Sequence, residues 1–187
     1  TRFNILSQAG VAALAQASTP RVAALACGVN VSGTGFVVGA GWVVTAAHVV
    51  AGASVVRLQA VQGTVDATVV LFDPRMDLAL LHAPSLVAPA LQFAAPDPER
   101  GTIGVALGYA GGGPLVIIPA AVAGSYPARG LDIYGRERVT RHILELRAAV
   151  DRGDSGGPLV LEGGRVGGVV FAESRSDAEV GYALAAG

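Results

Sequence analysis

The sequence has no lysine, one cysteine and few charged residues of any kind. Only 14% of its 187 residues are charged, the net charge is −1, and neither acidic nor basic residues form a run. A nucleic acid or an anionic membrane surface is bound through clustered basic residues, so the composition argues against both as the main partner. The hydrophobic fraction of 52% is ample for the core of one domain, or of two small lobes that share a core.

Long unbroken apolar runs are also missing. Two stretches carry no formal charge, one between Arg21 and Arg57 and one from Thr102 to Ala128, and either is long enough to span a bilayer. Glycine clusters break both, and prolines break the second. The apolar residues between the breaks form short β-branched pieces, which are typical of buried strands rather than of spanning helices.

The single cysteine, Cys27, has two interpretations. It is either a small buried hydrophobic residue or half of a disulfide whose partner lies beyond Gly187. The chain begins with Thr1 and has no signal peptide, so we expect a mature or excised fragment from which targeting information has been removed. No metal-ligand spacing and no phosphate-binding loop is present, and we expect no cofactor.

Local patterns predict one short helix followed by strands. Apolar residues recur at helical spacing from Asn4 to Gln16, and Ser18-Thr19-Pro20 ends the run. Turn residues then separate short β-type segments. The first six predicted strands are Val22–Val31, Thr34–Val38, Trp42–Thr45, Ser54–Ala60, Val65–Phe72 and Leu78–His82.

A proline-rich stretch divides this series from a second one. Proline cannot donate a strand hydrogen bond, so residues 84–100 are predicted to be a connector. We therefore expect an all-β fold of two six-stranded antiparallel β-barrels, at about 21–83 and 101–187, after an N-terminal helical extension at 1–20. The later predicted strands are Ile103–Tyr109, Leu115–Tyr126, Val139–Val150, Pro158–Leu161, Arg165–Ala172 and Val180–Leu184.

The most informative motif is Gly153-Asp154-Ser155-Gly156-Gly157-Pro158. A serine becomes a nucleophile when a base takes its proton and a tight turn holds its hydroxyl exposed. Glycines on both sides permit such a turn, and the N–H groups of Gly153 and Ser155 would then form an oxyanion hole. The motif also matches the nucleophile elbow of α/β-hydrolases, but that fold needs a histidine after the serine, and here every histidine precedes Ser155.

His48 is the predicted general base among the three histidines. It directly follows the strand Trp42–Thr45, and the small residues before it leave room for the ring over a cleft. His82 ends an apolar strand, and His142 lies in a charged patch with Arg138, Arg141 and Glu145 that we expect to be solvated. The predicted acid is Asp77 at the entrance to an apolar strand, because a carboxylate there needs a partner.

At these residues the sequence resembles the chymotrypsin-like, or trypsin-fold, serine proteases. The matching pieces are Thr45-Ala46-Ala47-His48, Asp77-Leu78-Ala79-Leu80 and the Ser155 motif, in the family's His, Asp, Ser order. Gly33-Thr34-Gly35-Phe36 and the segment from Gly101 to Gly108 resemble bacterial HtrA-like protease cores. The similarity covers roughly residues 21–184, and is closest to the extracytoplasmic domain of actinobacterial membrane-anchored serine proteases implicated in acid resistance.

The resemblance implies a catalytic cleft between the barrels and peptide or protein substrates. It also implies membrane helices upstream of this fragment and a place in the periplasm or cell envelope, tethered to the inner membrane. The resemblance to the actinobacterial relatives implies a disulfide between Cys27 and the C-terminal region. The pancreatic members pair the residue equivalent to Asp154 with a freed N-terminus; here Thr1 opens an extension, and we expect Asp154 to pair with an arginine or with backbone donors.

The substrate-binding residues implied by the resemblance depart from those of trypsin. Ala149 stands where trypsin has an aspartate, so a preference for Arg or Lys is not expected. Phe171 stands where the family commonly has a serine that supports the catalytic aspartate. We expect a small-to-medium apolar pocket and a strand that pairs with the substrate backbone. The complete predicted set is Ala149, Val150, Arg152, Phe171, Ala172, Glu173 and Gly181.

The sequence is compatible with three functions. The leading prediction is an endopeptidase that works through an acyl-enzyme on Ser155. A protease-shaped binding module with a misassembled or occupied site is the alternative from another class, and it would not react with a fluorophosphonate. An esterase or acyl-transferase with the same triad is separable by comparing ester with peptide substrates.

Overall fold

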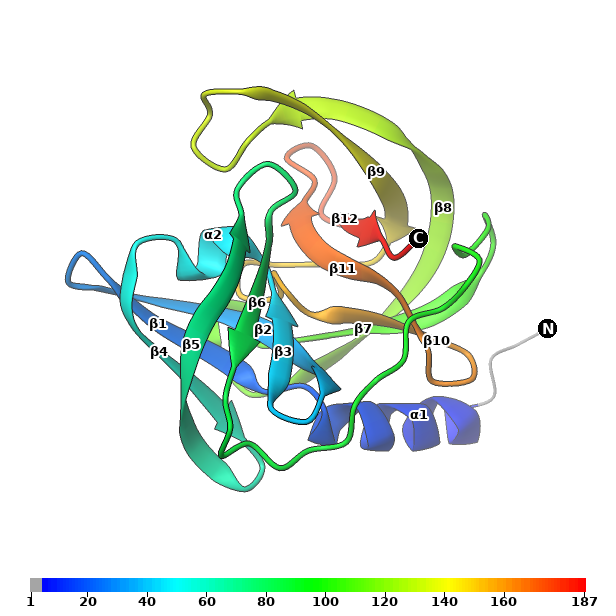
Figure 1. Ribbon diagram of the computed structural model, residues 1–187. Coiled ribbons are helices and arrows are strands. Elements are labelled where there is room, and N and C mark those ends of the chain that lie inside the picture. The colour runs from blue at the N-terminus through cyan, green and yellow to red at the C-terminus, as the bar shows by residue number, and fades with distance from the viewer. Residues whose placement is uncertain (1–4) are drawn as a thin grey trace.

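The computed structural model describes residues 5–187 (Figure 1). Its helix α1 spans Ile5–Ala17 and lies beneath the second barrel, where Ala15 packs with Leu107 and Val160. The predicted helix started at Asn4, which lies outside the described residues. Among the described residues, no helix has the length and apolar character needed to cross a membrane.

The first barrel closes from six antiparallel strands. Closure pairs every strand on both sides and leaves no open sheet edge. Inward-facing residues alternate along the strands, as in β1, where Val22 and Ala24 are buried. Around the barrel the strands are β1 (Arg21–Ala26), β2 (Val29–Gly39), β3 (Trp42–Thr45), β6 (Leu78–His82), β5 (Gly63–Asp73) and β4 (Ala53–Ala60).

The second barrel also closes from six antiparallel strands. The hairpin of its two longest strands, β8 and β9, arches over the molecule and reaches the first barrel (Figure 1). The predicted all-β fold of two six-stranded barrels with an N-terminal helix is confirmed. Around the barrel the strands are β10 (Pro158–Leu161), β11 (Val166–Glu173), β12 (Val180–Ala185), β9 (Arg138–Arg147), β8 (Val116–Leu131) and β7 (Ile103–Gly108).

Several predicted strand boundaries are wrong. The strand expected at Val22–Val31 is cut by a turn at Cys27-Gly28, where both residues have positive φ angles of 50° and 76°. Such a pair matches the twist of a two-residue hairpin turn, but cysteine seldom occupies that position. Cys27 is consequently exposed and has a free thiol, which overturns the interpretation as a buried hydrophobic residue.

The two longest strands also differ from the prediction. β8 continues five residues beyond Tyr126 because its pairing with β9 extends to Leu131 opposite Arg138. β9 ends at Arg147 rather than at Val150. The Ala148 N–H bonds to Glu179 instead of to a strand neighbour, and Val150 N–H bonds back to Ala148, which turns the chain toward Ser155.

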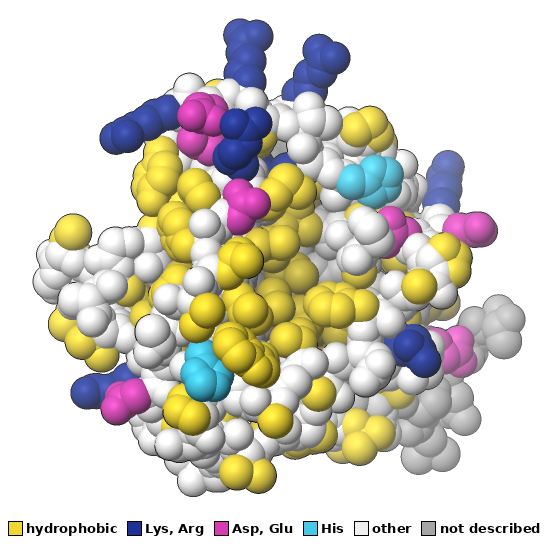
Figure 2. Space-filling model, in the orientation of Figure 1, with side chains coloured by type: hydrophobic (Ala, Val, Ile, Leu, Met, Phe, Trp, Pro, Cys, Tyr) yellow, Lys and Arg dark blue, Asp and Glu magenta, His cyan; other side chains and the backbone are white. Residues whose placement is uncertain are grey.

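The barrels share an apolar interface. Phe36 of β2 is wholly buried with Val166, Val169 and Leu184 of the second barrel, and partly buried residues such as Leu91 surround this cluster. Figure 2 shows apolar side chains gathered in the centre of this face, with charged ones toward its edge. Residues of both barrels therefore form one apolar cluster at the junction between them.

The connector at residues 83–102 is not a loose linker. Leu91 N–H donates to Val37 O of the first barrel at 2.8 Å. Ala94 N–H donates to Val166 O of the second barrel, and Val166 N–H donates to Gln92 O, both at 2.8 Å. These three bonds attach the connector to both barrels.

Candidate active site

His48 and Asp77 meet at one end of the first barrel. β3 ends at Thr45, and the short helix α2 (Ala47–Val50) follows and carries His48. Asp77 lies in the turn between β5 and β6, with its backbone in the left-handed region at φ 58°, a conformation that aspartate tolerates better than most residues. His48 Nδ1 lies 2.7 Å from Asp77 Oδ2, and His48 N–H donates to Asp77 Oδ1 at 2.9 Å.

The aspartate is shielded while the histidine is accessible. The Asp77 side chain is 7% exposed and that of His48 is 39% exposed. A carboxylate that accepts from both the ring and the backbone of one residue fixes the ring orientation and stabilises an imidazolium. This geometry leaves Nε2 as the ring nitrogen that can exchange a proton with another group.

Ser155 lies in a turn pressed against the first barrel. A Cβ on Gly156 would come within 2.0 Å of Thr34 O and 2.8 Å of Ala46 N, so only glycine fits this approach. Thr34 N–H donates to Ser155 O at 2.9 Å. The serine is thereby attached next to the segment that leads into His48. Within residues 5–187, no hydrogen bond joins Ser155 Oγ to His48, and such contacts commonly shorten only when substrate binds.

The loop around Ser155 presents two free backbone donors. Between Val150 and Gly157, every N–H group has an acceptor in the described part of the chain except those of Gly153 and Ser155. Unpaired N–H groups that are two residues apart on a tight turn can bind a single oxyanion. The structure thus leaves free the two donors that the sequence assigned to an oxyanion hole.

Asp154 points away from this turn into the protein. It is 1% exposed, its Oδ2 accepts from Asp151 N–H at 2.8 Å, and its Oδ1 has no hydrogen-bond partner in the described structure. Burial raises the pKa of this carboxyl; the Asp151 N–H opposes the shift, and the charges of Asp151 and Glu173 add to it. Of the two partners that the sequence allowed, an arginine or a backbone donor, the structure contains the backbone donor.

Comparison with known proteins identifies the family of this chain. Residues 33–169 match the model of the trypsin-like peptidase domain. The chain belongs to the trypsin-like peptidase family. Serine protease Rv3671c of Mycobacterium tuberculosis is 44% identical over 180 residues, which are 95% of this chain and 45% of that protein. The chain therefore spans about half the length of this curated relative.

Solved structures give the same family. The active form of the Rv3671c protease superposes with a TM-score of 0.93 at 43% identity, over 97% of this chain and 81% of that one. Its inactive form gives a TM-score of 0.88 at 42% identity, over 97% of this chain and 89% of that one. The HtrA-type protease AlgW with a bound tripeptide shares the fold, with a TM-score of 0.86 at 24% identity over 96% of this chain and 60% of its own.

The residues expected to bind substrate in this trypsin-like domain surround Glu173. A pocket of about 630 Å³ is bounded by Ala149 and Val150 on one side and by the segment 173–178 on the other. Gly181 faces Val150 so closely that a Cβ there would lie 2.6 Å from Val150 Cγ2. Val150 therefore fills space at the place expected to receive a substrate side chain.

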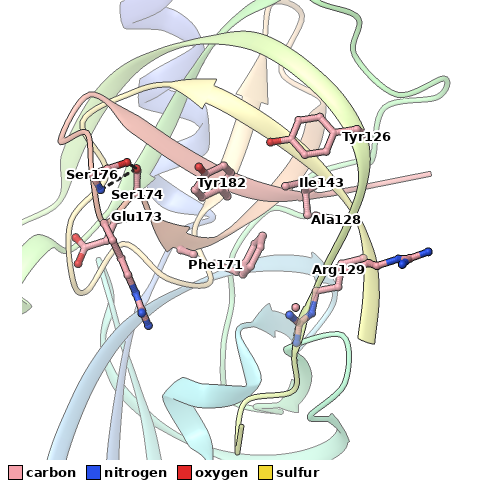
Figure 3. Close-up of a pocket in the computed structure, with 13 residues that line it drawn as sticks. Tyr126, Ala128, Arg129, Ile143, Phe171, Glu173, Ser174, Ser176 and Tyr182 are labelled. Atoms are coloured by element: carbon pink, nitrogen blue, oxygen red, sulfur yellow. Dashed lines mark hydrogen bonds between the residues drawn. The ribbon is translucent and has the colours of Figure 1, made fainter. Parts of the chain in front are cut away.

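A second pocket, of about 560 Å³, shares the segment 173–176 with the first. Phe171, Ala172 and Glu173 of β11 line it together with the β8–β9 hairpin, and Figure 3 shows Phe171, Tyr182 and Ile143 projecting toward this space from three strands. Arg152 reaches across from the Ser155 loop, with its Nε 3.9 Å from Glu173 Oε1. Five of the seven predicted substrate-binding residues thus line these two pockets, while Arg152 and Gly181 lie next to them, beside Glu173 and Val150.

The other two histidines of the trypsin-like domain lie elsewhere. His82 stacks on Trp42 with ring centroids 4.4 Å apart, at the far end of β3 from His48. His142 Nε2 lies 2.8 Å from Ser125 Oγ at an exposed position on β9. Neither is bonded to Asp77 or to the Ser155 loop in the described structure.

Two neighbours of the site escaped the sequence interpretation. Arg141, expected to be solvated, is 9% exposed, and its guanidinium lies 5.9 Å from the centre of the Phe171 ring. Its position in the strand could have revealed this, since every second residue of a strand faces the same side and Arg141 lies between the inward-facing Val139 and Ile143 of β9. Thr34 is wholly buried beside the Ser155 loop, and the resemblance of its segment to protease cores gave it no role.

Proposed function

We propose that this trypsin-like domain is a serine endopeptidase in which Ser155 is the nucleophile, His48 the general base and Asp77 the orienting acid. The observation that supports this most strongly is the double contact between His48 and Asp77, because it holds the ring of a partly exposed histidine at one end of a peptidase barrel. Ser155 is attached to the same barrel end through Thr34, and its hydroxyl lies in a turn with two free N–H donors in the described structure.

In the proposed reaction Ser155 Oγ attacks the carbonyl carbon of the scissile bond while its proton passes to His48 Nε2. The negative charge moves to the carbonyl oxygen, where the N–H groups of Gly153 and Ser155 bind it. The carbon–nitrogen bond then breaks, and His48 gives its proton to the departing amine. Water next attacks the acyl-enzyme, with His48 again taking and returning the proton, so that Ser155 is regenerated.

We further propose that Ala149, Val150, Gly181 and Arg152 form the wall of the pocket for the residue before the scissile bond, and that Phe171-Ala172-Glu173 pairs with the substrate backbone. The position of Val150 favours a small-to-medium apolar substrate residue, since the Val150 side chain occupies part of the space beside Gly181. No acidic side chain stands at Ala149 to bind an arginine or a lysine.

Covalent labelling tests the function directly. A fluorophosphonate probe should add one mass increment to the wild-type protein and none to Ser155→Ala. That substitution should also lower kcat on peptides by about 10⁶-fold, the size found when a triad nucleophile is removed. Absence of labelling of the folded wild type would favour a protease-shaped binding module, and turnover of esters without peptides would favour an esterase.

The cellular setting is proposed from the family resemblance. We infer an extracytoplasmic location, a tether to the inner membrane by a segment that precedes this domain, and a part in acid resistance. The exposed thiol of Cys27 is accessible to a disulfide partner beyond Gly187. We also infer the domain division into an extension at 1–20 and a protease domain at 21–187. The location is tested by fusing a reporter enzyme to the C-terminus of the full-length protein. The reporter is one that is active only outside the cytoplasm.

A further inference from the structure

The orientation of the Gly153 peptide groups decides whether the proposed oxyanion hole exists. Gly153 has a φ angle of 99°, which only glycine adopts freely, and glycine allows the adjoining peptide planes to rotate. A trans peptide directs its C=O and N–H to opposite sides. If the plane between Arg152 and Gly153 turned over, a carbonyl would replace the donor and repel an oxyanion.

In the described structure, hydrogen bonds hold the peptide groups on both sides of Gly153. On its N-terminal side, Gly111 N–H donates to Arg152 O at 2.6 Å, which directs the Gly153 N–H to the opposite side. On its C-terminal side, Thr34 Oγ1 donates to Gly153 O at 2.7 Å. Rotation of either peptide plane breaks one of these bonds.

Thr34 uses all of its polar atoms at this place. Its N–H donates to Ser155 O at 2.9 Å, and its hydroxyl accepts from Tyr109 N–H at 3.1 Å while it donates to Gly153 O. Its carbonyl accepts from Thr45 Oγ1 at 2.7 Å. Thr34 is 0% exposed, so water cannot replace these partners.

We propose that Thr34 is a positioning residue that keeps the oxyanion donors of the Ser155 loop aligned, and that its hydroxyl is the group responsible. The hydroxyl joins three segments: β2 of the first barrel, the Gly153–Ser155 turn, and Tyr109 at the start of the loop that carries Gly111. The single hydroxyl therefore couples the carbonyl side of Gly153 to the loop that holds its N–H side. The inference rests on the proposed peptidase function.

Two substitutions of Thr34 test it. Thr34→Val keeps the shape and removes the hydroxyl, and we expect kcat to fall at least about 10-fold with little change in KM, because losing an oxyanion donor outright costs about 10²–10³-fold. Affinity for a peptide boronate, which resembles the tetrahedral intermediate, should fall by a similar factor. Thr34→Ser restores the hydroxyl and should recover most of both losses.

Thr19→Val is the matched control for lost stability. Thr19 is 1% exposed and its Oγ1 donates to Ala15 O at 2.7 Å, so the change removes a buried hydroxyl bond from outside the Ser155 loop. It should lower the free energy of unfolding and leave kcat unchanged. If Thr34→Val fails to fold, Thr34→Ala and Thr34→Ser make the same comparison.

The outcomes separate this inference from the proposed function. An unreactive wild type would refute the peptidase function itself. A reactive wild type with a Thr34→Val variant of equal kcat and equal boronate affinity would refute the role of Thr34 alone. A Thr34→Ser variant as impaired as Thr34→Val would refute the role of the hydroxyl.

Discussion

Arg141 Nε donates to the carbonyl oxygen of Arg75 at 2.8 Å, across the junction between the two barrels. Its NH1 group donates to Leu131 O at 3.1 Å within its own hairpin. The hairpin makes a second contact nearby, where Ile133 N–H donates to Pro74 O at 3.1 Å. The second barrel therefore holds the turn that leads to Asp77, whose backbone is in the left-handed region.

Removing the positive charge of Arg141 should loosen the turn that carries Asp77. Arg141→Met removes two part-buried hydrogen bonds, at about 1 kcal/mol for each bond lost, so both the free energy of unfolding and kcat should fall. Arg141→Lys can still reach one carbonyl and should lose less. Arg138→Met, on an exposed position of the same strand, is the control and should change neither quantity. Urea unfolding together with peptide turnover makes the comparison, and a fully active Arg141→Met would contradict the role.

Asp77→Asn should leave the fold intact and remove most of the activity. The amide can offer an N–H where the carboxylate accepted one, which favours the wrong tautomer of His48. In serine protease triads this change lowers kcat by about 10⁴-fold. Stopped or continuous peptide assays give kcat, and circular dichroism checks the fold. A decrease of only a few fold would show that Asp77 is not the orienting acid.

The Asp154 carboxyl should make stability depend on pH. Burial raises its pKa above the ordinary value of 3.8, so the folded protein holds this proton more tightly than the unfolded chain does. Stability is therefore lost as the pH rises from 3.8 through the raised value, and no penalty remains below 3.8. Asp154→Asn does not ionise, so its stability relative to the wild type should increase over that interval. Urea unfolding of both proteins across the acid range measures the difference, and a constant difference would contradict it.

Val150 should set the size of the preferred substrate residue. A peptide panel that varies the residue before the scissile bond should favour Ala, Val or Leu in the wild type. Val150→Ala opens the space beside Gly181 and should shift kcat/KM toward Phe and Met, by the 10- to 200-fold range that small differences in pocket volume produce. A wild-type preference for Arg or Lys would refute the proposed apolar pocket.

The elements that the sequence predicted well are those whose pattern is local. Strand alternation and turn residues gave six strands on each side of a proline-rich connector, and the Ser155 motif contains its own turn glycines. The turn at Cys27-Gly28 was missed because cysteine rarely adopts a positive φ, so the residues gave no turn signal.

Features that depend on contacts between distant segments could not be read from the chain. The burial of Arg141 depends on carbonyls of Arg75 and Leu131 that a hairpin brings to it, although its phase on β9 pointed inward. The N–H groups of Gly153 and Ser155 are free because the neighbouring backbone groups bond elsewhere. One of those bonds comes from Gly111, which donates to Arg152 O and lies 42 positions before Gly153 in the chain. Pairing of this kind is a property of the folded topology and has no local signature.

The connector that bonds to Val37 on one side and to Val166 on the other has a consequence for cooperativity. A flexible tether would let each barrel melt by itself, whereas a segment bonded to both must lose its contacts when either one opens. Since Phe36 of the first barrel is also buried among residues of the second, neither half retains a complete apolar interior alone. Heating should therefore give one sharp calorimetric transition for the whole molecule.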